Sequence, residues 1–228
     1  MLNFKLPIET STDFDAMKGK IFGMKNLMLS ISSFFLVSLL GCQKENSLEV
    51  SESPLIGFTE YTIPKNKSYS VDSMSVIPVT GVSEMKFLFR FDASAIYTTV
   101  DPMNQYDINK LYGFADCVSF TTLYTIAPHH INSARFGWAW LNQSLRIYGY
   151  CYNDSVRISK ELQTVAIGKT YAAGIKIFPG GYEFTIDNKK DTLSRICSST
   201  SISGYKLFPY FGGTETAPQE VHIWIKEL

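Results

Sequence analysis

Alternation of apolar and polar residues with a period of two is the feature that most restricts the fold of this 228-residue chain. In the segment 85–91 (MKFLFRF), the odd-numbered positions are Met or Phe, while the even-numbered positions include Lys86 and Arg90. Such a period predicts half-buried β-strands, because successive side chains of a strand point to opposite faces. The same pattern recurs in the segments 134–140, 144–152, 171–178, 182–187, 205–211 and 220–226. No segment keeps a helical period over three turns, so the expected secondary structure is mainly β.

Short turn sequences separate these segments and predict that neighbouring strands pair as hairpins. The connections are 141–143 (LNQ), 179–181 (PGG) and 187–190 (DNKK), which carry the residue types that tight turns require. Many short strands with hairpin connections and few helices favour an antiparallel sandwich or barrel. We therefore predict an all-β fold, an antiparallel two-sheet jelly-roll sandwich, over residues 55–228.

Residues 24–42 (MKNLMLSISSFFLVSLLGC) carry the features of a secretion signal. Lys25 supplies a positive start, and an apolar stretch of about 14 residues follows, which is too short to span a bilayer comfortably as a helix. The end of the segment, LLGC, resembles the lipobox of bacterial lipoproteins. We expect cleavage before Cys42 and acylation of Cys42, which would anchor the chain to a membrane. A short membrane anchor or a buried helix is the alternative interpretation.

This interpretation divides the chain into four parts. Residues 1–23 precede the signal and are expected to result from a start codon chosen upstream of the true one at Met24. Residues 24–41 form the signal peptide, 42–54 the lipidated cysteine and a polar tether, and 55–228 the sandwich domain. The expected location is the cell envelope, at the outer membrane of a Gram-negative bacterium.

Charge and cysteine content restrict the function further. The chain has 21 Lys and Arg residues against 21 Asp and Glu residues, so it has no basic excess to attract nucleic acid. Besides Cys42, three thiols remain, which allow at most one internal disulfide. Cys117 with Cys197 is one candidate pair, and Cys151 is expected to be a small buried residue of a strand.

Two neighbouring strands place cationic and phenolic side chains on faces that could coincide. The first has Ser133, Arg135, Gly137 and Ala139 on one face, and the second has Arg146, Tyr148, Tyr150 and Tyr152 on one face. The opposite face of the second strand is mostly aliphatic and is expected to face the core. If the polar faces coincide, a guanidinium that can grip a carboxylate lies among several phenols, an arrangement that suits an acidic polysaccharide. The alternative is a solvated sheet face whose Tyr rings only cover apolar surface.

Three segments in this order resemble the jelly-roll (concanavalin A-like) polysaccharide lyases that act on alginate and glucuronan. They are 109–114 (NKLYGF), 133–138 (SARFGW) and 145–152 (LRIYGYCY). Those enzymes show a Lys-Leu-Pro-Gly-Leu segment, a Ser-Ala-Arg or Ser-Thr-Arg strand, and a strand with Tyr-x-Tyr. The resemblance implies that Lys110, Ser133, Arg135, Tyr148 and Tyr150 line a substrate groove. A second register would use Tyr150 with Tyr152, and Tyr112 stands where the family has Pro.

The resemblance also implies a reaction, the β-elimination of a uronate polymer. Arg135 and Lys110 would neutralise the uronate carboxylate and stabilise the charge that develops beside it. Tyr148 or Tyr150 would remove the proton, provided that the nearby cations lower its pKa. Substrate contacts are expected from Ser133, Arg146, Tyr152 and His130, with no cofactor and no metal.

Other patterns are weaker. In an extended chain, His129 and His130 would point to opposite sides, so that only one borders the groove and the two do not share a metal. The clustered Glu-x-Asp-x-Glu carboxylates of jelly-roll glucanases are absent from the sequence, which argues against a glycoside hydrolase. The function predicted is that of an envelope lipoprotein that binds, and in a sharper version cleaves, an acidic polysaccharide. The alternative is a non-catalytic structural or protein-binding lipoprotein.

Overall fold

The computed structural model describes residues 55–70, 76–118 and 127–228. The predicted signal peptide, Cys42 and the tether lie outside these described residues. No helix within the described ranges is long and apolar enough to cross a membrane.

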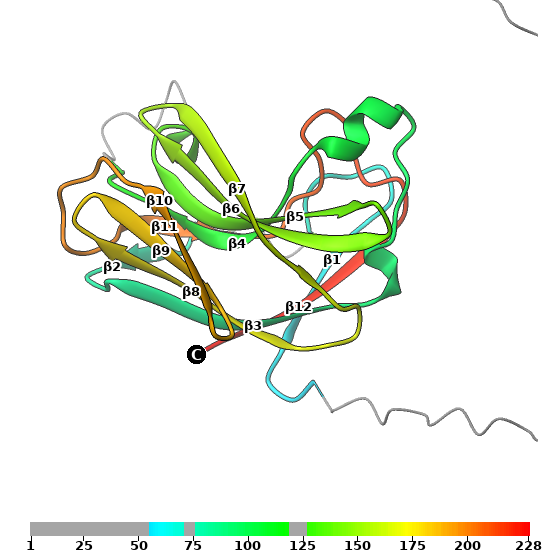
Figure 1. Ribbon diagram of the computed structural model, residues 1–228, viewed down its shortest axis with the longest axis horizontal. Coiled ribbons are helices and arrows are strands. Elements are labelled where there is room, and N and C mark those ends of the chain that lie inside the picture. Colours follow the sequence, from blue (N-terminus) through cyan, green and yellow to red (C-terminus); the bar gives the residue numbers. More distant parts are fainter. Residues whose placement is uncertain (1–54, 71–75, 119–126) are drawn as a thin grey trace, which may run out of the picture. The chain divides into compact units, whose positions relative to one another are not determined.

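Two antiparallel sheets of six strands each build the fold, which confirms the predicted two-sheet sandwich (Figure 1). The first sheet, here called the outer sheet, has the order β1 (Thr59–Ile63), β12 (Val221–Glu227), β3 (Glu84–Phe91), β8 (Tyr171–Phe178), β9 (Gly181–Ile186), β10 (Lys189–Ser194). The second, here called the groove sheet, has the order β2 (Pro78–Thr80), β11 (Ser203–Leu207), β4 (Asn109–Ala115), β5 (Ser133–Leu141), β6 (Ser144–Asn153), β7 (Val156–Val165). Short 3-10 turns lie at η2 (Ala93–Ala95), η3 (Pro102–Tyr106) and η4 (Pro128–His130).

Aromatic side chains from both sheets interdigitate to form the core. Phe136 of β5 contacts Phe87 of β3 and Phe184 of β9, with ring centroids 5.7 and 5.1 Å apart. Trp138 contacts Phe91 in the same way at 5.1 Å. All five side chains are buried, and each contributes about 1.5–3 kcal/mol by leaving water. The alternation that predicts the strands therefore also selects the core face of β3 and β5.

Tight turns join consecutive strands at each of the three predicted connections. Between β5 and β6, Asn142 and Gln143 have φ angles of 52° and 58°, the left-handed conformation that both central residues of a type I′ turn adopt. Asp154 and Ser155, with φ angles of 47° and 66°, make a comparable turn between β6 and β7. This last hairpin and strand β7 are absent from the sequence prediction.

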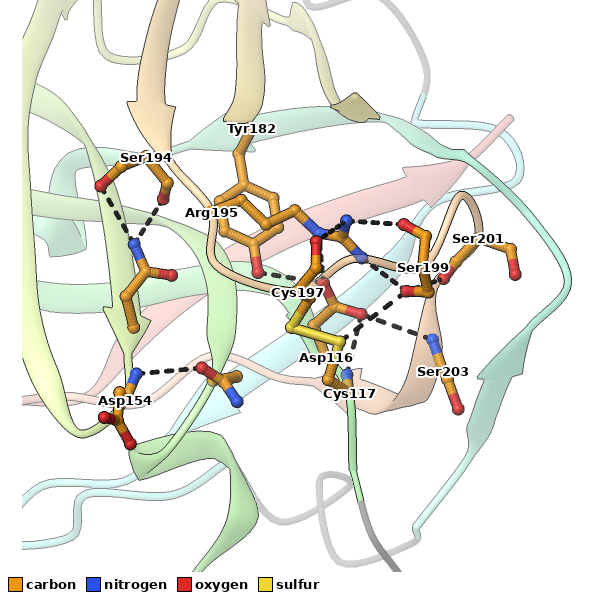
Figure 2. Close-up of polar contacts among 12 residues, drawn as sticks. Asp116, Cys117, Asp154, Tyr182, Ser194, Arg195, Cys197, Ser199, Ser201 and Ser203 are labelled. Carbon is orange, nitrogen blue, oxygen red and sulfur yellow. Dashed lines mark hydrogen bonds and ion pairs between the residues drawn. A yellow bond between two sulfur atoms is a disulfide. The ribbon is translucent and has the colours of Figure 1, made fainter. Parts of the chain in front are cut away.

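A buried polar network ties the end of β4 to the segment before β11 (Figure 2). The side chains of Asp116 and Arg195 are fully buried and form an ion pair at 2.7 Å, and the Tyr182 hydroxyl donates to Asp116 at 3.0 Å. A disulfide joins Cys117 to Cys197, so the predicted candidate pair is confirmed, and Cys151 is free and buried. Asp116 and the two bridged sulfurs bring possible metal ligands together, but the ion pair and the disulfide already engage them.

Candidate functional site

A cavity of about 680 Å³ opens on the face of the groove sheet that is turned away from the core. Strands β11, β4, β5, β6 and β7, which are neighbours in this order in the groove sheet, all contribute to its lining. Its polar and aromatic lining residues include Tyr69, Lys110, His129, His130, Arg135, Tyr150, Tyr152, Arg157, Tyr205 and Tyr210. Five of the eight residues predicted for the site therefore line one cavity, namely Lys110, His130, Arg135, Tyr150 and Tyr152.

The pairing of β5 with β6 brings the cation and the phenols to one face. Arg135 lies opposite Tyr150, and Ser133 lies opposite Tyr152. Residues directly opposite each other in an antiparallel pair point to the same side of the sheet. The shared polar face predicted from the alternation is thus confirmed, while the intervening residues Phe136 and Cys151 are buried in the core.

A β-bulge directs Lys110 into the cavity. On β4, Lys110 pairs with Gly137 and Gly113 pairs with Arg135, so three steps along β4 match two steps along β5. The extra residue lets Leu111 and Tyr112 both pack into the core, and it turns Lys110 to the same face as Arg135. Gly113 permits the close approach of the strands, because a Cβ there would lie 2.2 Å from the Ala134 carbonyl oxygen.

Arg135 is a buried cation without an acidic partner among the described residues. Arg135 is only 6% exposed, and its Nε atom has no hydrogen-bond partner within the described part of the chain. The guanidinium carbon lies 5.4 Å from the centre of the Tyr150 ring. Burial lowers the pKa of Arg135, which shows that the charged form is held at a cost.

Lys110 adds a second cation beside the same phenol. Its Nζ donates a hydrogen bond of 2.7 Å to the carbonyl of Gly212 and lies 5.4 Å from the ring centres of Tyr150 and Tyr210. Burial, followed by the charge of Arg135, lowers the pKa of Lys110 to about 8. The ammonium is therefore mostly charged at neutral pH but is much easier to deprotonate than an ordinary lysine.

Tyr150 and Tyr205 are not activated as bases in this structure. Burial raises the pKa of Tyr150 to about 12, and a hydrogen bond with Tyr152 adds to that effect, whereas Arg135 and Arg157 lower it only in part. Burial also raises the pKa of Tyr205. The condition set for a tyrosine base, a pKa lowered by the neighbouring cations, is therefore not met at Tyr150, because desolvation outweighs their attraction.

Both histidines border the cavity, which corrects the expectation that only one would. They lie in the 3-10 turn η4 and not in an extended strand, and their ring centroids are 4.4 Å apart. Nδ1 of His129 is 2.9 Å from the Tyr205 hydroxyl, and burial followed by Arg135 lowers the pKa of His129 to about 4. Burial lowers the pKa of His130 as well. The two imidazoles are therefore neutral at neutral pH.

Three predicted site residues do not line the cavity. Ser133 is fully buried, and its hydroxyl donates to the His129 carbonyl at 2.7 Å, so it supports the histidine turn. Arg146 forms an ion pair of 2.9 Å with Glu161. Tyr148 shares the face of Tyr150 but lies opposite Gly137, outside the lining residues.

Several lining residues are absent from the sequence prediction. Tyr205 lies on β11, and Tyr210 lies in the segment that follows this strand. Tyr69 pairs with Tyr210 through an isolated bridge. Arg157 lies on the edge strand β7, opposite Tyr152. The high tyrosine content of the chain is the only sequence signal that bears on three of these four residues.

No protein-family model matches the sequence, and no curated protein matches it. Solved structures do resemble the fold. Alginate lyase AlyC3 is 10% identical with a TM-score of 0.49, over 75% of this chain and 74% of that one. The catalytic domain of an endo-1,3-beta-glucanase (laminarinase) from Thermotoga petrophila RKU-1 is 8% identical with a TM-score of 0.46, over 75% and 76%. Alginate lyase A1-II′, a member of polysaccharide lyase family 7, is 10% identical with a TM-score of 0.46, over 75% and 80%.

Proposed function

We propose that the cavity binds an acidic polysaccharide and holds one acidic group of a sugar between Arg135 and Lys110. The observation that carries this proposal is the buried guanidinium of Arg135, which has no acidic partner among the described residues. A buried charge is costly unless an opposite charge compensates it. A carboxylate of the ligand would supply that charge and accept hydrogen bonds from the fork of the guanidinium.

The aromatic lining supports a sugar as the carrier of that acidic group. Tyr150 and Tyr152 present neighbouring rings 5.8 Å apart, and Tyr69 and Tyr210 present a second pair 4.8 Å apart. Such rings combine a flat apolar surface with a hydroxyl that can donate or accept a hydrogen bond. Tyr69 is 62% exposed, which suits a ring that a ligand would cover.

Binding is favoured over cleavage because burial raises the pKa of Tyr150, the phenol that lies beside both deep cations, to about 12. A neutral phenol can donate a proton to a leaving oxygen, but at neutral pH it is a poor base. Elimination of a uronate polymer is therefore the narrower form of the proposal. It requires that a bound substrate makes it easier for a tyrosine of the cavity to lose its proton.

A panel of alginate, glucuronan and glycosaminoglycans, with a neutral β-glucan beside them, tests the proposal. We expect the purified protein to bind one or more acidic polymers and not the neutral one. Absorbance from newly formed unsaturated sugar ends in the same samples would report elimination. Equal binding of the neutral polymer, or no binding of any acidic one, would contradict the proposal and favour the structural or protein-binding alternative.

Arg135→Met supplies the sharpest variant, because it removes the charge but keeps an unbranched apolar stem. We expect binding to be lost while the free energy of unfolding stays equal or rises, since a buried uncompensated cation disappears. Lys176→Gln is the matched control, since it also removes one positive charge, but from an exposed position on the outer sheet. It should affect neither binding nor the free energy of unfolding. Retained binding in Arg135→Met would exclude Arg135 as the anchor.

We also propose that the chain is a lipoprotein of the cell envelope, anchored through Cys42 at the outer membrane. The support is the LLGC sequence that follows the apolar stretch before Cys42. Mass spectrometry of the protein from bacterial membranes should find acyl groups on Cys42 at the new N-terminus. Protein recovered from membranes with an unmodified Cys42 would contradict the anchor.

A further inference from the structure

We propose that Arg157 forms a second anion-binding position, so that the groove selects a chain with at least two acidic groups over a single acidic sugar. This inference rests on the proposed function, and it adds a requirement on the length and charge of the ligand. Arg135 with Lys110 would hold one acidic group near the middle of the sheet, and Arg157 would hold another at the edge.

The register of the groove sheet positions Arg157 for this role. Arg157 on β7 lies directly opposite Tyr152 on β6, and Arg135 on β5 lies opposite Tyr150 on the other side of the same strand. The two arginines therefore flank a strand that presents two adjacent phenols. Because neighbouring strands lie about 4.8 Å apart, the backbones that carry the arginines are separated by roughly 10 Å across the sheet. Arg157 therefore enters the lining from the edge strand and the two deep cations from the middle of the sheet, positions that successive sugars of one chain can reach.

Arg157 is also available for a ligand. It is exposed, it lines the cavity, and it forms no ion pair with any other residue that the structure describes. Arg146, which lies nearby on β6, contrasts with it because the carboxylate of Glu161 on β7 already compensates its charge. Lys206, at the other side of the cavity, is likewise compensated by Glu227 at 2.5 Å. Uncompensated charge in the lining is thus confined to Lys110, Arg135 and Arg157 within the described part of the chain.

The charge of Arg157 also acts on groups in the deep part of the cavity. Burial is the main cause of the lowered pKa of Lys110 and of the raised pKa of Tyr150, and the charge of Arg157 adds a smaller effect that lowers both. Arg157 therefore acts on the same enclosed space as the two deeper cations. One bound carboxylate would neutralise only part of this field, and a second acidic group beside Arg157 would neutralise more of it.

The opposite end of the cavity gives the bound chain a direction. Tyr210 lies beside Lys110 through an isolated bridge, and Tyr69 lies beside Tyr210 in the same way. Across the strands, the lining thus begins at the exposed ring of Tyr69 and passes through Tyr210 to Lys110. It then continues over Arg135 and Tyr150 to Arg157. A bound chain would cross the strands, with an aromatic contact at one end and a cationic contact at the other.

Binding of uronates of increasing length to Arg157→Gln tests the inference. The probes are glucuronic acid and the mannuronate disaccharide, trisaccharide and tetrasaccharide, measured by titration calorimetry. For the unaltered protein we expect the affinity to rise between the monosaccharide and the tetrasaccharide. In Arg157→Gln we expect the affinity for the tetrasaccharide to fall about tenfold, as the loss of one charge-assisted contact predicts, while that for the monosaccharide stays within about twofold.

Lys176→Gln is the matched control, since it removes one exposed positive charge from the outer sheet. It should leave the affinity at every length unchanged, which separates a local contact from a general effect of net charge. If Arg157→Gln weakens all lengths equally, or none of them, the second position is wrong although the proposed function survives. If the unaltered protein binds no acidic glycan of any length, the proposed function itself fails, and this inference fails with it.

Discussion

Arg135 and Tyr150 lie directly opposite each other on β5 and β6, with the guanidinium carbon 5.4 Å from the centre of the phenol ring. The ammonium of Lys110 lies at the same distance from this ring. A cation beside an aromatic face gains about 0.5–2 kcal/mol, which offsets only part of the cost of burying two like charges together. A bound carboxylate would relieve the repulsion between Arg135 and Lys110, so these two cations favour the binding of an anion in the cavity.

Anion binding should weaken as the pH rises through about 8. Below that value Lys110 is protonated and attracts an acidic sugar, and above it the ammonium loses its charge. A bound carboxylate stabilises the ammonium, so the transition in the complex should lie above that of the free protein. We expect the affinity for an oligouronate to fall roughly tenfold between pH 7 and pH 9.5, a difference that titration calorimetry resolves.

Lys110→Met is the control for this pH dependence. It should bind more weakly at pH 7 and should vary little over the same range, since the titrating group is gone. Measurements should be made in buffers of equal ionic strength, because salt screens the attraction. An unaltered protein whose affinity is flat from pH 7 to pH 9.5 would contradict a role for the Lys110 charge.

Gly113→Ala should destabilise the fold because β4 and β5 approach closely at the bulge. The new Cβ would lie 2.2 Å from the Ala134 carbonyl oxygen and 2.4 Å from Cα of Arg135, both backbone atoms that cannot move aside alone. We expect the free energy of unfolding to fall by about 2–4 kcal/mol in denaturant titrations. Gly174→Ala on β8 is the matched control, since its Cβ would meet atoms no closer than 3.6 Å. Similar losses in the two variants would show that the bulge does not need glycine.

The faces of β5 and β6 could be predicted because they follow from local alternation alone. A period of two decides which residues share a face, and the turn at Asn142 and Gln143 then fixes which residues pair. The direction of Lys110 could not be predicted in this way. Strict alternation places Lys110 on the face of Tyr112 and Phe114, which is the core face, and only the bulge reverses it. The resemblance of the NKLYGF segment, and not its alternation, indicated a place for Lys110 in the groove.

The remaining lining residues depend on contacts that local patterns do not contain. Strand β7 is a largely exposed edge strand, and Lys160 interrupts its apolar alternation between Ile158 and Leu162. The sequence prediction therefore omits this strand, and Arg157 with it. Tyr205 lies on β11, which pairs with β4. Tyr210 reaches the cavity through an isolated bridge to Lys110, and Tyr69 through an isolated bridge to Tyr210. These pairings join segments far apart in the chain. The prediction for the two histidines is wrong because a 3-10 turn, and not an extended strand, carries them.

The protein should lose stability on acidification in part through His129. The pKa of His129 is about 4 in the folded chain, against about 6.5 in an unfolded one. Between these values the unfolded chain binds more protons, so the free energy of unfolding falls as the pH decreases from about 6.5 to about 4. The contribution of this single group is roughly 2–4 kcal/mol once the pH lies below both values.

His129→Asn removes this titration and keeps a side chain that can hydrogen-bond the Tyr205 hydroxyl. Denaturant titrations at pH 7 and pH 4.5 should show a smaller loss of stability on acidification in the variant than in the unaltered protein. His222→Asn is the comparison, since His222 lies on β12 of the outer sheet. If His129→Asn and the unaltered protein lose stability in parallel, His129 is not the group that responds.

Removing one partner of the buried pair Asp116 and Arg195 should cost far more stability than removing a surface charge. In Arg195→Met, Asp116 keeps the hydrogen bonds from the Tyr182 hydroxyl and the Cys117 amide but loses its only opposite charge among the described residues. We expect the free energy of unfolding to fall by about 3–5 kcal/mol, because an uncompensated carboxylate stays buried. The double variant Asp116→Asn with Arg195→Met should recover a large part of that loss, since the amide oxygen can still accept from the Cys117 amide and its NH2 group can donate to the Tyr182 hydroxyl oxygen. Denaturant titrations under oxidising conditions, which keep the Cys117–Cys197 disulfide intact, measure both effects. A double variant no more stable than Arg195→Met would show that the buried charge is not the source of the loss.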